Sequence, residues 1–444
     1  MNTPTMEQLV SLCKRRGFIF QGSEIYGGLA GTWDYGPLGL ALKNNIKAIW
    51  WKQFVTDRTD MYGIDAAILM NPRVWQASGH VAGFSDPLVE CSNCKSRFRA
   101  DHLESDTCPS CGKTATFGEA RQFNMMFKTS VGAVESEDSV SYLRPETAQG
   151  MFVNFKNILD AYQPKLPFGM AQIGKAFRNE IAPRDFVFRV REFEQMEIEY
   201  FIDPRDERGV NETFDALFDE QMKFLQSIGL SKDKIHKIEV PEADRAHYSK
   251  RSVDTEYDFP FGQKELLGLA YRTDYDLAAH RDASGVDLSY FDEETKERLV
   301  PHCIEPTFGV DRLVLAVLAN AYKQEGEGDD MRTVLALAPA VAPYKACVSP
   351  LLKNKPELVA KAREVFDVLK RSIGAITWDD NGNIGKRYRR QDEIGTPWCI
   401  VVDFDTLGEN PELEGTVTIR DRDTGAQERV AINDLESYIT SRLS

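Results

Sequence analysis

The sequence lacks the features that mark membrane-spanning and secreted proteins. No stretch of its 444 residues approaches the roughly 18 consecutive apolar residues that a membrane span needs. The first residues, Met-Asn-Thr-Pro-Thr-Met-Glu-Gln, have neither the basic nor the apolar region of a signal peptide. Hydrophobic residues at 42% and charged residues at 28% are typical of a soluble globular enzyme. We therefore expect a cytoplasmic protein with no membrane partner.

Other absences narrow the possible ligands. The glycine-rich stretch 27–39 lacks the Gly-Lys-Ser/Thr ending of a P-loop, so we do not expect it to hold a phosphate. The formal net charge of −15 argues against a nonspecific nucleic-acid binder, because such proteins neutralise phosphates with Lys and Arg. The charge leaves open an RNA partner that is held by local basic patches.

The eight cysteines do not form a disulfide pattern. Four are scattered, and four form two close pairs, Cys91-x2-Cys94 and Cys108-x2-Cys111. In a cytoplasmic protein, two such pairs separated by a loop of this length indicate a structural Zn²⁺ held by four thiolates. The alternative is a reduced knuckle without metal.

The chain divides into two regions of different pattern. A Gly-rich acidic run near residues 324–330 predicts a linker at 326–331. After it, strands alternate with helices, which predicts a small α/β domain over 332–444. The first domain, 1–325, contains a long alternating run at 186–202 that is typical of an antiparallel strand with one polar face. Within this domain we expect an insertion at about 86–120, which carries the cysteine pairs, and a helical insertion at about 203–250.

Arginine, glutamate and phenylalanine recur around residues 177–193. An Arg and a carboxylate two residues apart on a strand, such as Arg178 and Glu180, point to the same face. The guanidinium can fork onto a phosphate while the Glu accepts from a base or ribose, and Phe193 can stack on a purine. The alternative for the pair is a cross-strand ion pair.

A second candidate segment runs from Glu305 to Arg312 and opens an apolar helix. Gly309 permits a close backbone approach, and Arg312 lies in the first turn, where a cation opposes the helix dipole. An anionic ligand such as a triphosphate accounts for that arginine, and an ion pair with Asp311 is the alternative. Glu146 and Glu197 add carboxylates that are costly to bury unless a cation, a substrate ammonium or Mg²⁺, satisfies them.

One dense basic cluster stands out in this acidic chain. It consists of Lys386, Arg387, Arg389 and Arg390, interleaved with Tyr388. Cations next to an aromatic ring suit single-stranded RNA, because stacking and phosphate contacts then occur together. The alternative is a solvated helix face.

Taken together, these segments resemble the glycyl-tRNA synthetases of the homodimeric, single-chain type. The resemblance covers nearly the whole chain, and the stretches that carry it are 75–80, 144–150, 177–180, 189–197, 272–277, 305–312 and 385–397. It implies an α+β chain in which a class II catalytic domain, built on an antiparallel sheet with a zinc-ribbon-like insertion, precedes a C-terminal α/β anticodon-binding domain. Motif 1 would end at Pro72 and build the dimer interface, motif 2 would comprise 177–180 and the strand through 197, and motif 3 would comprise 309–312.

The resemblance also implies roles for individual residues. Arg178 would bind the α-phosphate of ATP, Arg189 the terminal phosphates and Glu180 the adenine side. Phe193 and Arg312 would enclose the adenine ring, an arrangement with cation–π character. The implied nucleotide site comprises Arg178, Asn179, Glu180, Phe188, Arg189, Val190, Arg191, Glu192, Phe193, Glu265, Leu266, Gly309, Val310, Asp311 and Arg312, with Arg178 and Arg312 as catalytic residues.

The implied amino-acid site lies beside the nucleotide. Its residues are Arg99, Glu146, Phe193, Glu194, Gln195, Met196, Glu197, Glu305, Pro306, Thr307, Phe308 and Gly309. Glu265 and Glu305 are candidates for holding Mg²⁺, and the basic cluster at 386–390 would contact the anticodon. Thr307 and Tyr271 stand where the family usually has Ser and Asn.

The resemblance implies a ligase that activates glycine with ATP and transfers it to tRNA(Gly). Selection of the smallest amino acid favours steric exclusion, because an added methylene contributes only ~1–3 kcal/mol to discrimination. The alternatives are another class II synthetase, such as a prolyl or threonyl type, and a non-catalytic synthetase-like protein. The latter lacks the arginines of motifs 2 and 3, which this chain retains.

Overall fold

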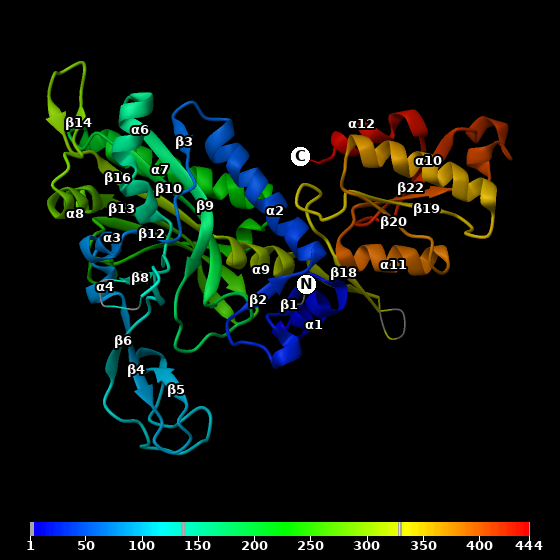
Figure 1. Ribbon diagram of the computed structural model, residues 1–444. Coiled ribbons are helices and arrows are strands. Elements are labelled where there is room, and N and C mark those ends of the chain that lie inside the picture. Colours follow the sequence, from blue (N-terminus) through cyan, green and yellow to red (C-terminus); the bar gives the residue numbers. More distant parts are fainter. Residues whose placement is uncertain (1–3, 135, 137–138, 327, 329–330, 444) are drawn as a thin grey trace.

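The computed structural model describes residues 4–134, 136, 139–326, 328 and 331–443. The chain forms a larger body, blue through green in Figure 1, and a smaller one, orange to red, beside it. In the described part of the chain, no helix has the length and apolar character that would let it cross a membrane.

A seven-stranded sheet forms the centre of the larger body, in the order β11-β12-β13-β16-β10-β9-β3. Neighbouring strands pair antiparallel, except that β3 runs parallel to β9 at one edge. The strands are β3 (Met61–Gly63), β9 (Phe168–Phe177), β10 (Glu192–Ile202), β11 (Ile235–Glu239), β12 (Arg251–Phe259), β13 (Gly262–Thr273) and β16 (His302–Gly309). The antiparallel sheet predicted for the first domain is therefore present.

Besides α1 (Met6–Arg16), three helices pack with the central strands in the largest hydrophobic core. They are α2 (Pro37–Trp51), α7 (Glu207–Ser227) and α9 (Val310–Ala321). The apolar stripe of α7 is buried in this core, and α9 is buried along almost its whole length. The predicted insertion at 203–250 is consequently no separate unit, because α7 belongs to the core and β11 forms an edge of the main sheet.

A smaller apolar cluster involves three further helices, α5 (Ala148–Phe152), α6 (Phe155–Tyr162) and α8 (Tyr275–Ser284). The cluster includes Phe168 of β9, Phe201 of β10 and Cys303 of β16. Because neighbours along a strand point to opposite faces, β10 contributes Ile198, Tyr200 and Ile202 to one core and Phe201 to the other.

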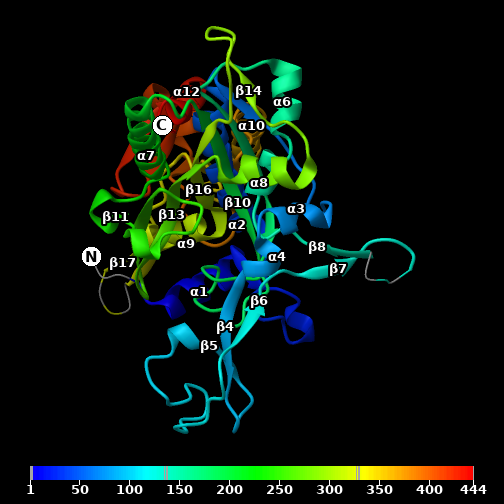
Figure 2. The ribbon, with the colours of Figure 1, turned by 90° about the vertical axis from the view of Figure 1, so that its left-hand side faces the viewer.

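The segment with the cysteine pairs projects from the larger body (Figures 1 and 2). It contains a three-stranded sheet in which β4 (Ser85–Glu90) pairs with β5 (Arg97–Arg99) and β6 (Arg121–Asn124). The short elements on either side of it along the chain are α3 (Pro72–Ala77), α4 (His80–Gly83), β7 (Lys128–Ser130) and β8 (Val140–Tyr142). The N-terminal α1 (Met6–Arg16), β1 (Ile19–Gln21) and β2 (Trp33–Tyr35) complete the larger body together with the hairpin of β14 (Tyr290–Phe291) and β15 (Arg298–Leu299).

The smaller body has a five-stranded sheet in the order β20-β19-β21-β22-β23. Its first three strands are parallel, and the last two add antiparallel pairs. Its elements are β19 (Ala346–Pro350), α10 (Pro356–Ser372), β20 (Ile376–Trp378), α11 (Ile384–Ile394), β21 (Trp398–Val402), β22 (Thr416–Asp421), β23 (Gln427–Ala431) and α12 (Leu435–Thr440). The predicted α/β character of this region is confirmed.

The boundary between the bodies differs from the predicted one at residue 332. β18 (Arg332–Leu335) pairs with β17 (Tyr322–Glu325), and the residues up to Ala342 still pack in the first core. The second core begins at Ala346. A short apolar strand does not reveal which core covers it, so the prediction placed this hairpin arm in the wrong body. Residues 327, 329 and 330 of the predicted linker 326–331 lie outside the described residues.

The predicted strand at 186–202 is also shorter than expected. β10 begins only at Glu192, and the preceding residues form a turn in which Asp185 and Phe186 have positive φ angles of 60° and 59°. Arg178 and Glu180 likewise follow the end of β9. They are therefore loop residues, and their proximity does not come from strand alternation.

Candidate active site

Two neighbouring strands, β10 and β16, carry the functional side chains on one face. Their antiparallel register pairs Glu197 with Thr307. On β10, Phe193, Gln195 and Glu197 share a face, whereas Met196 and Ile198 point into the largest core. Alternation therefore separates substrate-facing residues from core residues along one strand.

An elongated cavity of about 320 Å³ lies at the Gly309 end of these strands. Its walls come from the turn before β10, from β13 and from the start of α9. The lining residues are Arg99, Met125, Arg178, Glu180, Val187, Phe188, Arg189, Val190, Phe193, Glu194, Gln195, Glu265, Leu266, Gly268, Thr307, Gly309, Asp311 and Arg312.

Two arginines of this cavity lie against aromatic rings. The Arg178 guanidinium carbon is 5.3 Å from the centre of the Phe193 ring, and its Nε donates to the Pro145 carbonyl at 3.0 Å. The Arg312 guanidinium carbon is 4.4 Å from the centre of the Phe188 ring, and its Nη1 donates to Glu265 Oε2 at 3.1 Å. Cation–π contacts do not neutralise a cation, so the charge of Arg178 stays available to an anion, whereas Arg312 also has an ion pair with the partly exposed Glu265.

Glu180 presents a buried acceptor at the same cavity. Its Oε2 has no hydrogen-bond partner among the described residues. Burial raises the pKa of Glu180, and the charges of Arg189 and Arg178 only partly oppose that effect. A buried oxygen without a partner is unfavourable, so a ligand N–H at this position would gain a hydrogen bond.

Arg99 reaches the cavity from the projecting segment. Its Nη1 lies 2.7 Å from Asp86 Oδ2, and its Nη2 lies 2.6 Å from Asp101 Oδ2. Asp86 is on β4 and Arg99 ends β5, so the sheet of the projecting segment fixes where this cation lies.

A cluster of buried carboxyl groups lies deeper along β10 and β16. Carboxylate oxygens of Glu197, Glu199 and Glu305 all lie within 4.8 Å of one another. Arg272 on β13 donates to both oxygens of Glu305 at 2.9 and 3.0 Å, and to both oxygens of Asp276 at 2.8 Å. Burial, with added negative charge from neighbouring carboxylates, nevertheless raises the pKa of Glu305 to about 8.

Glu146, which lies beside this cluster, and Glu197 within it are held by other polar side chains. Glu146 contacts His80 Nε2 at 3.2 Å and accepts from Gln149 Nε2 at 3.1 Å. Burial opposes its ionisation, but His80 and the Arg272 charge hold the pKa of Glu146 below its usual range. Glu197 accepts from the hydroxyls of Thr147 and of Thr307, the latter at 3.2 Å. Burial and the charge of Glu146 raise the pKa of Glu197.

Several residues expected in the amino-acid site face elsewhere. The carboxylate of Glu194 lies 3.0 Å from the amines of both Lys43 and Lys47 on α2, so it touches only the edge of the cavity. Met196 and Phe308 are fully buried in the largest core, and Pro306 shares the strand face of Phe308. The prediction took whole segments of β10 and β16, whereas a strand offers only alternate residues to one face.

Some residues expected in the nucleotide site also lie outside the cavity. Arg191 donates to the Ala30 carbonyl, Glu192 pairs with Lys175 at 2.7 Å, and Val310 is buried in the core. Asn179 makes a backbone hydrogen bond to Met125 and does not line the cavity. Glu305, expected to share Mg²⁺ with Glu265, is instead engaged by Arg272 in the carboxyl cluster.

Other site residues were not predicted as such. His80, Gln149, Arg272 and Asp276 hold the carboxylates, and Met125, Val187 and Gly268 line the cavity. Arg272 lies on β13 and Asp276 on α8, so their spacing in the sequence gave no signal of a helical ion pair. Met125, Val187 and Gly268 are apolar or small, and such side chains do not indicate a binding site in a sequence.

The four cysteines of the projecting segment meet in space. Their Sγ atoms lie within 4.8 Å of one another, with Cys91 and Cys111 at 3.8 Å and Cys94 and Cys108 at 3.6 Å. Four thiolates at tetrahedral Zn–S distances of about 2.3 Å are separated by about 3.8 Å, so the donor set and its spacing fit zinc.

The basic cluster on α11 divides into inward and outward residues. Arg387 is buried and donates to the carbonyls of Gly382, Asp380 and Pro350, so its guanidinium is occupied within the fold. Lys386 and Arg389 are exposed. The prediction of four RNA-facing cations does not fit Arg387, because its side chain points inward from α11.

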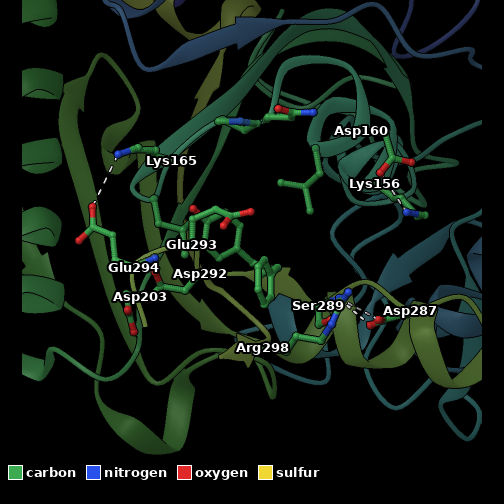
Figure 3. Close-up of a pocket in the computed structure, with 16 residues that line it drawn as sticks. Lys156, Asp160, Lys165, Asp203, Asp287, Ser289, Asp292, Glu293, Glu294 and Arg298 are labelled. Atoms are coloured by element: carbon green, nitrogen blue, oxygen red, sulfur yellow. Dashed lines mark hydrogen bonds and ion pairs between the residues drawn. The ribbon is translucent and has the colours of Figure 1, made fainter. Parts of the chain in front are cut away.

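A larger hollow, of about 660 Å³, lies apart from this site between α6 and the β14–β15 hairpin (Figure 3). Its charged side chains pair at the rim, as Lys165 does with Glu294 at 3.6 Å and Arg298 with Asp287 at 3.2 Å. It shares no residue with the arginine-lined cavity. Each of its charged side chains has an ion-pair partner in the hollow or next to it, which gives no indication of a ligand.

Comparison with known proteins identifies the class to which the fold belongs. The tRNA synthetase class II core domain (G, H, P, S and T) matches residues 127–321, and the anticodon binding domain matches residues 345–442. The two matches, together with the sheet and the arginines, define a class II tRNA synthetase.

Individual relatives narrow the class further. The glycine–tRNA ligase of Clostridium tetani is 51% identical over 99% of this chain and 98% of the relative. Those of Clostridium acetobutylicum and Geobacillus kaustophilus are 50% and 49% identical, over 99% of each chain. The chain belongs to the glycine–tRNA ligase family, which sets aside the prolyl, threonyl and accessory-protein alternatives.

Proposed function

We propose that the arginine-lined cavity binds ATP and that the adjoining carboxyl cluster binds glycine. As a member of its family, the chain activates glycine with ATP and transfers the glycine to tRNA. The observation that carries the residue assignment is the meeting of these two environments along β10 and β16. Each environment is complementary to one substrate: cations to a triphosphate, and carboxylates to an ammonium.

At the nucleotide end, Arg178 binds the α-phosphate and Arg189 the outer phosphates. Arg312 and Phe193 hold the adenine ring between them, and the partnerless oxygen of Glu180 accepts from the adenine amino group. Mg²⁺, which is general to class II synthetases, adds charge neutralisation at the outer phosphates when bound, and Glu265 is the cavity carboxylate suited to it.

At the amino-acid end, Glu146, Glu197 and Glu305 bind the glycine ammonium. The glycine carboxylate attacks the α-phosphorus, the bond to the bridging oxygen breaks, and pyrophosphate leaves. Arg178 stabilises the negative charge that develops on the α-phosphate oxygens. A terminal ribose hydroxyl of tRNA then attacks the carbonyl of the adenylate, and AMP leaves. No nucleophilic side chain is required, because both attacking groups belong to substrates.

Glycine is selected because larger amino acids do not fit. Thr147 and Thr307 both donate to Glu197, so their methyl groups lie beside the carboxylate that binds the ammonium. A side chain on the Cα atom of the amino acid meets these groups. Overpacking of this kind is unfavourable by about 1–3 kcal/mol for small increments, and no attractive contact is needed for the discrimination.

The remaining features complete the proposal. Cys91, Cys94, Cys108 and Cys111 hold a structural Zn²⁺ in a ribbon-like insertion, and this fixes the sheet that delivers Arg99. Lys386, Arg389 and Arg390 contact the anticodon of tRNA(Gly). The protein acts in the cytoplasm as a homodimer of the single-chain type, with Pro72 ending the motif that builds the interface.

The assignment is tested by ATP–pyrophosphate exchange with each of the twenty amino acids at fixed Mg²⁺. We expect exchange with glycine alone. Exchange with a different amino acid would contradict the specificity assigned to the carboxyl cluster. Absence of exchange with all twenty, with tRNA and zinc also supplied, would contradict the assignment of the cavity.

A further inference from the structure

A fourth glutamate, Glu199, lies behind the carboxylates assigned to glycine. It is fully buried on the same face of β10 as Glu197, two residues further along. Its Oε2 accepts from the Cys303 thiol at 2.9 Å, and its Oε1 has no partner among the described residues. The register of β10 against β16 places Glu199 opposite Glu305.

The surroundings of Glu199 divide into an apolar side and an acidic side. Met170 of β9 is its register partner, and the adjoining apolar cluster contributes Phe201 and the side chains of α5. The ionisable groups that face it are Glu197 on its own strand, Cys303 and Glu305 on β16, and Arg272 on β13. Arg272 is already engaged by both oxygens of Glu305 and of Asp276.

The charge around Arg272 does not balance if every acid is ionised. Carboxyl groups of Glu146, Glu197, Glu199, Asp276 and Glu305 all lie in this region, and the basic side chains that contact them among the described residues are Arg272 and His80. Like charges directly opposite on paired strands are destabilising, and a buried charge without a partner is more so. Burial and the opposing charge of Glu305 raise the pKa of Glu199 well above its usual range.

We propose that Glu199 is a positioning residue that remains a neutral carboxylic acid and, when bound glycine holds Glu305 in its ionised form, donates its proton from Oε1 to the Glu305 carboxylate. This inference rests on the proposed glycine site. The donated hydrogen bond gives the unpartnered oxygen its partner and fixes Glu305 from behind, while Arg272 holds it from the side. The front of the Glu305 carboxylate then remains directed at the glycine ammonium. Glu199 itself does not touch the substrate.

The test compares Glu199→Gln with Glu199→Met. Glutamine keeps the shape and a donor, whereas methionine keeps approximate length and removes the donor. For Glu199→Met we expect the KM for glycine to rise about 10- to 100-fold, the loss of one hydrogen bond to a charged group, with an unchanged KM for ATP. For Glu199→Gln we expect kcat/KM within about threefold of the unmodified protein and the same dependence on pH between 6 and 9.

Each alternative gives a different result. If Glu199 binds substrate as an anion, glutamine fails as badly as methionine and the pH profile changes, which overturns the proposal. If Glu199 merely fills space, methionine is tolerated, which also overturns it. Failure of the glycine site itself is distinguishable, because the unmodified protein would then show no glycine-dependent exchange.

A spectroscopic measurement keeps the proposal testable if Glu199→Met does not fold. The infrared difference spectrum between the unmodified protein and Glu199→Gln, at pH 7, reports the carbonyl stretch of a protonated carboxylic acid. We expect that band in the unmodified protein, at a position that shifts in Cys303→Val, because the thiol donates to the same carboxyl group. A carboxylate band at pH 7 in place of the acid band would overturn the proposal.

Discussion

The two ends of the proposed active site differ in how far their charged groups are already paired within the fold. At the glycine end the charges already have partners: Arg272 holds Glu305 and Asp276, and His80 holds Glu146. At the nucleotide end, Arg178 lies against an aromatic ring without an ion pair among the described residues, Arg312 pairs only with the partly exposed Glu265, and Glu180 has an oxygen without a partner. The small substrate meets a site held in place by the fold, and the large substrate supplies partners of its own.

Size explains this difference. Glycine offers few contacts, so the protein itself must hold the groups that recognise it, and their alignment before binding avoids an ordering cost. ATP has many charged oxygens that can align arginine side chains on arrival. Helix α11 repeats the contrast on a smaller scale, with Arg387 occupied inside the fold and Lys386 exposed.

The largest loss of stability should follow from removing Arg272, the cation of the glycine end. Arg272→Met leaves buried carboxylates without compensation, which destabilises proteins by about 3–5 kcal/mol. Urea unfolding measures this loss. Arg281→Met on α8, where the arginine is partly exposed and pairs with Asp282, is the matched control and should change stability by less than about 0.5 kcal/mol. Equal stability of the two variants would remove the contrast between the ends.

A substitution at the nucleotide end should lower the activity with little change in stability. Arg178→Ala removes a cation from the developing charge on the α-phosphate, and we expect pyrophosphate exchange to fall about 10²–10³-fold. The urea midpoint should fall much less than in Arg272→Met, because Arg178 makes no ion pair among the described residues and gives one hydrogen bond, to the Pro145 carbonyl. The exposed Arg208, paired with Glu212 on α7, gives a control in Arg208→Ala with unchanged exchange. A fall in the urea midpoint as large as that of Arg272→Met would show that the two ends do not differ in this way.

Arg387, the buried arginine of α11, should resemble Arg272, because its substitution should lower stability. Arg387→Ala removes donors from carbonyls that then lack partners inside the fold, which we expect to destabilise the smaller body by about 1–3 kcal/mol. Differential scanning calorimetry separates its transition from that of the larger body. Pyrophosphate exchange should be unaffected, and a loss of exchange would show that the two bodies unfold together.

The pKa of about 8 for Glu305 predicts how glycine and pH act together. A carboxyl group whose folded pKa lies above its unfolded value of 4.5 contributes stability that is fully present below about pH 4.5 and is lost as the pH rises through about 8. Bound glycine offsets the loss, because its ammonium pairs with the ionised form. Saturating glycine should therefore stabilise the protein by about 1 kcal/mol more at pH 8.5 than at pH 6.5, which corresponds to a Tm difference of about 1–2 °C for a body of this size. An equal rise at both pH values would contradict this, and Glu305→Gln is the variant in which the difference should vanish.

The smallest effect should come from the exposed side of α11. Lys386→Ala removes one solvent-screened contact, so we expect the KM for tRNA to rise only about 1.5- to 5-fold, with exchange unchanged. The effect should shrink as salt is added. Comparison with Lys353→Ala, which lies outside α11, shows whether the position matters beyond its charge.

The sequence indicated the composition of the site better than its geometry. Arg178, Phe193 and Arg312 were expected to meet and all line the cavity, because their residue types are unusual in those contexts. Glu194 was expected beside Glu197 because the two are close in sequence. Alternation along β10 sends Glu194 to Lys43 instead, and this depended on where the strand begins.

The fold shows the same division between pattern and context. The antiparallel sheet and the α7 stripe follow from local periodicity. The hairpin of β17 and β18 does not, because an apolar strand fits either core equally well. Arg272 was visible only as part of a recognised stretch, since an ion pair that links β13, α8 and β16 requires knowledge of three elements in space.

The two-faced character of β10 makes the strand sensitive to length. A one-residue deletion between Phe193 and Glu199 would turn the carboxylates toward the core and bring Met196 and Ile198 to the substrate. The same deletion would disrupt the core and the proposed glycine site together, because it places charged residues in the core and apolar residues in the site. We therefore expect β10 to tolerate a one-residue insertion or deletion less well than a conservative substitution at a single position.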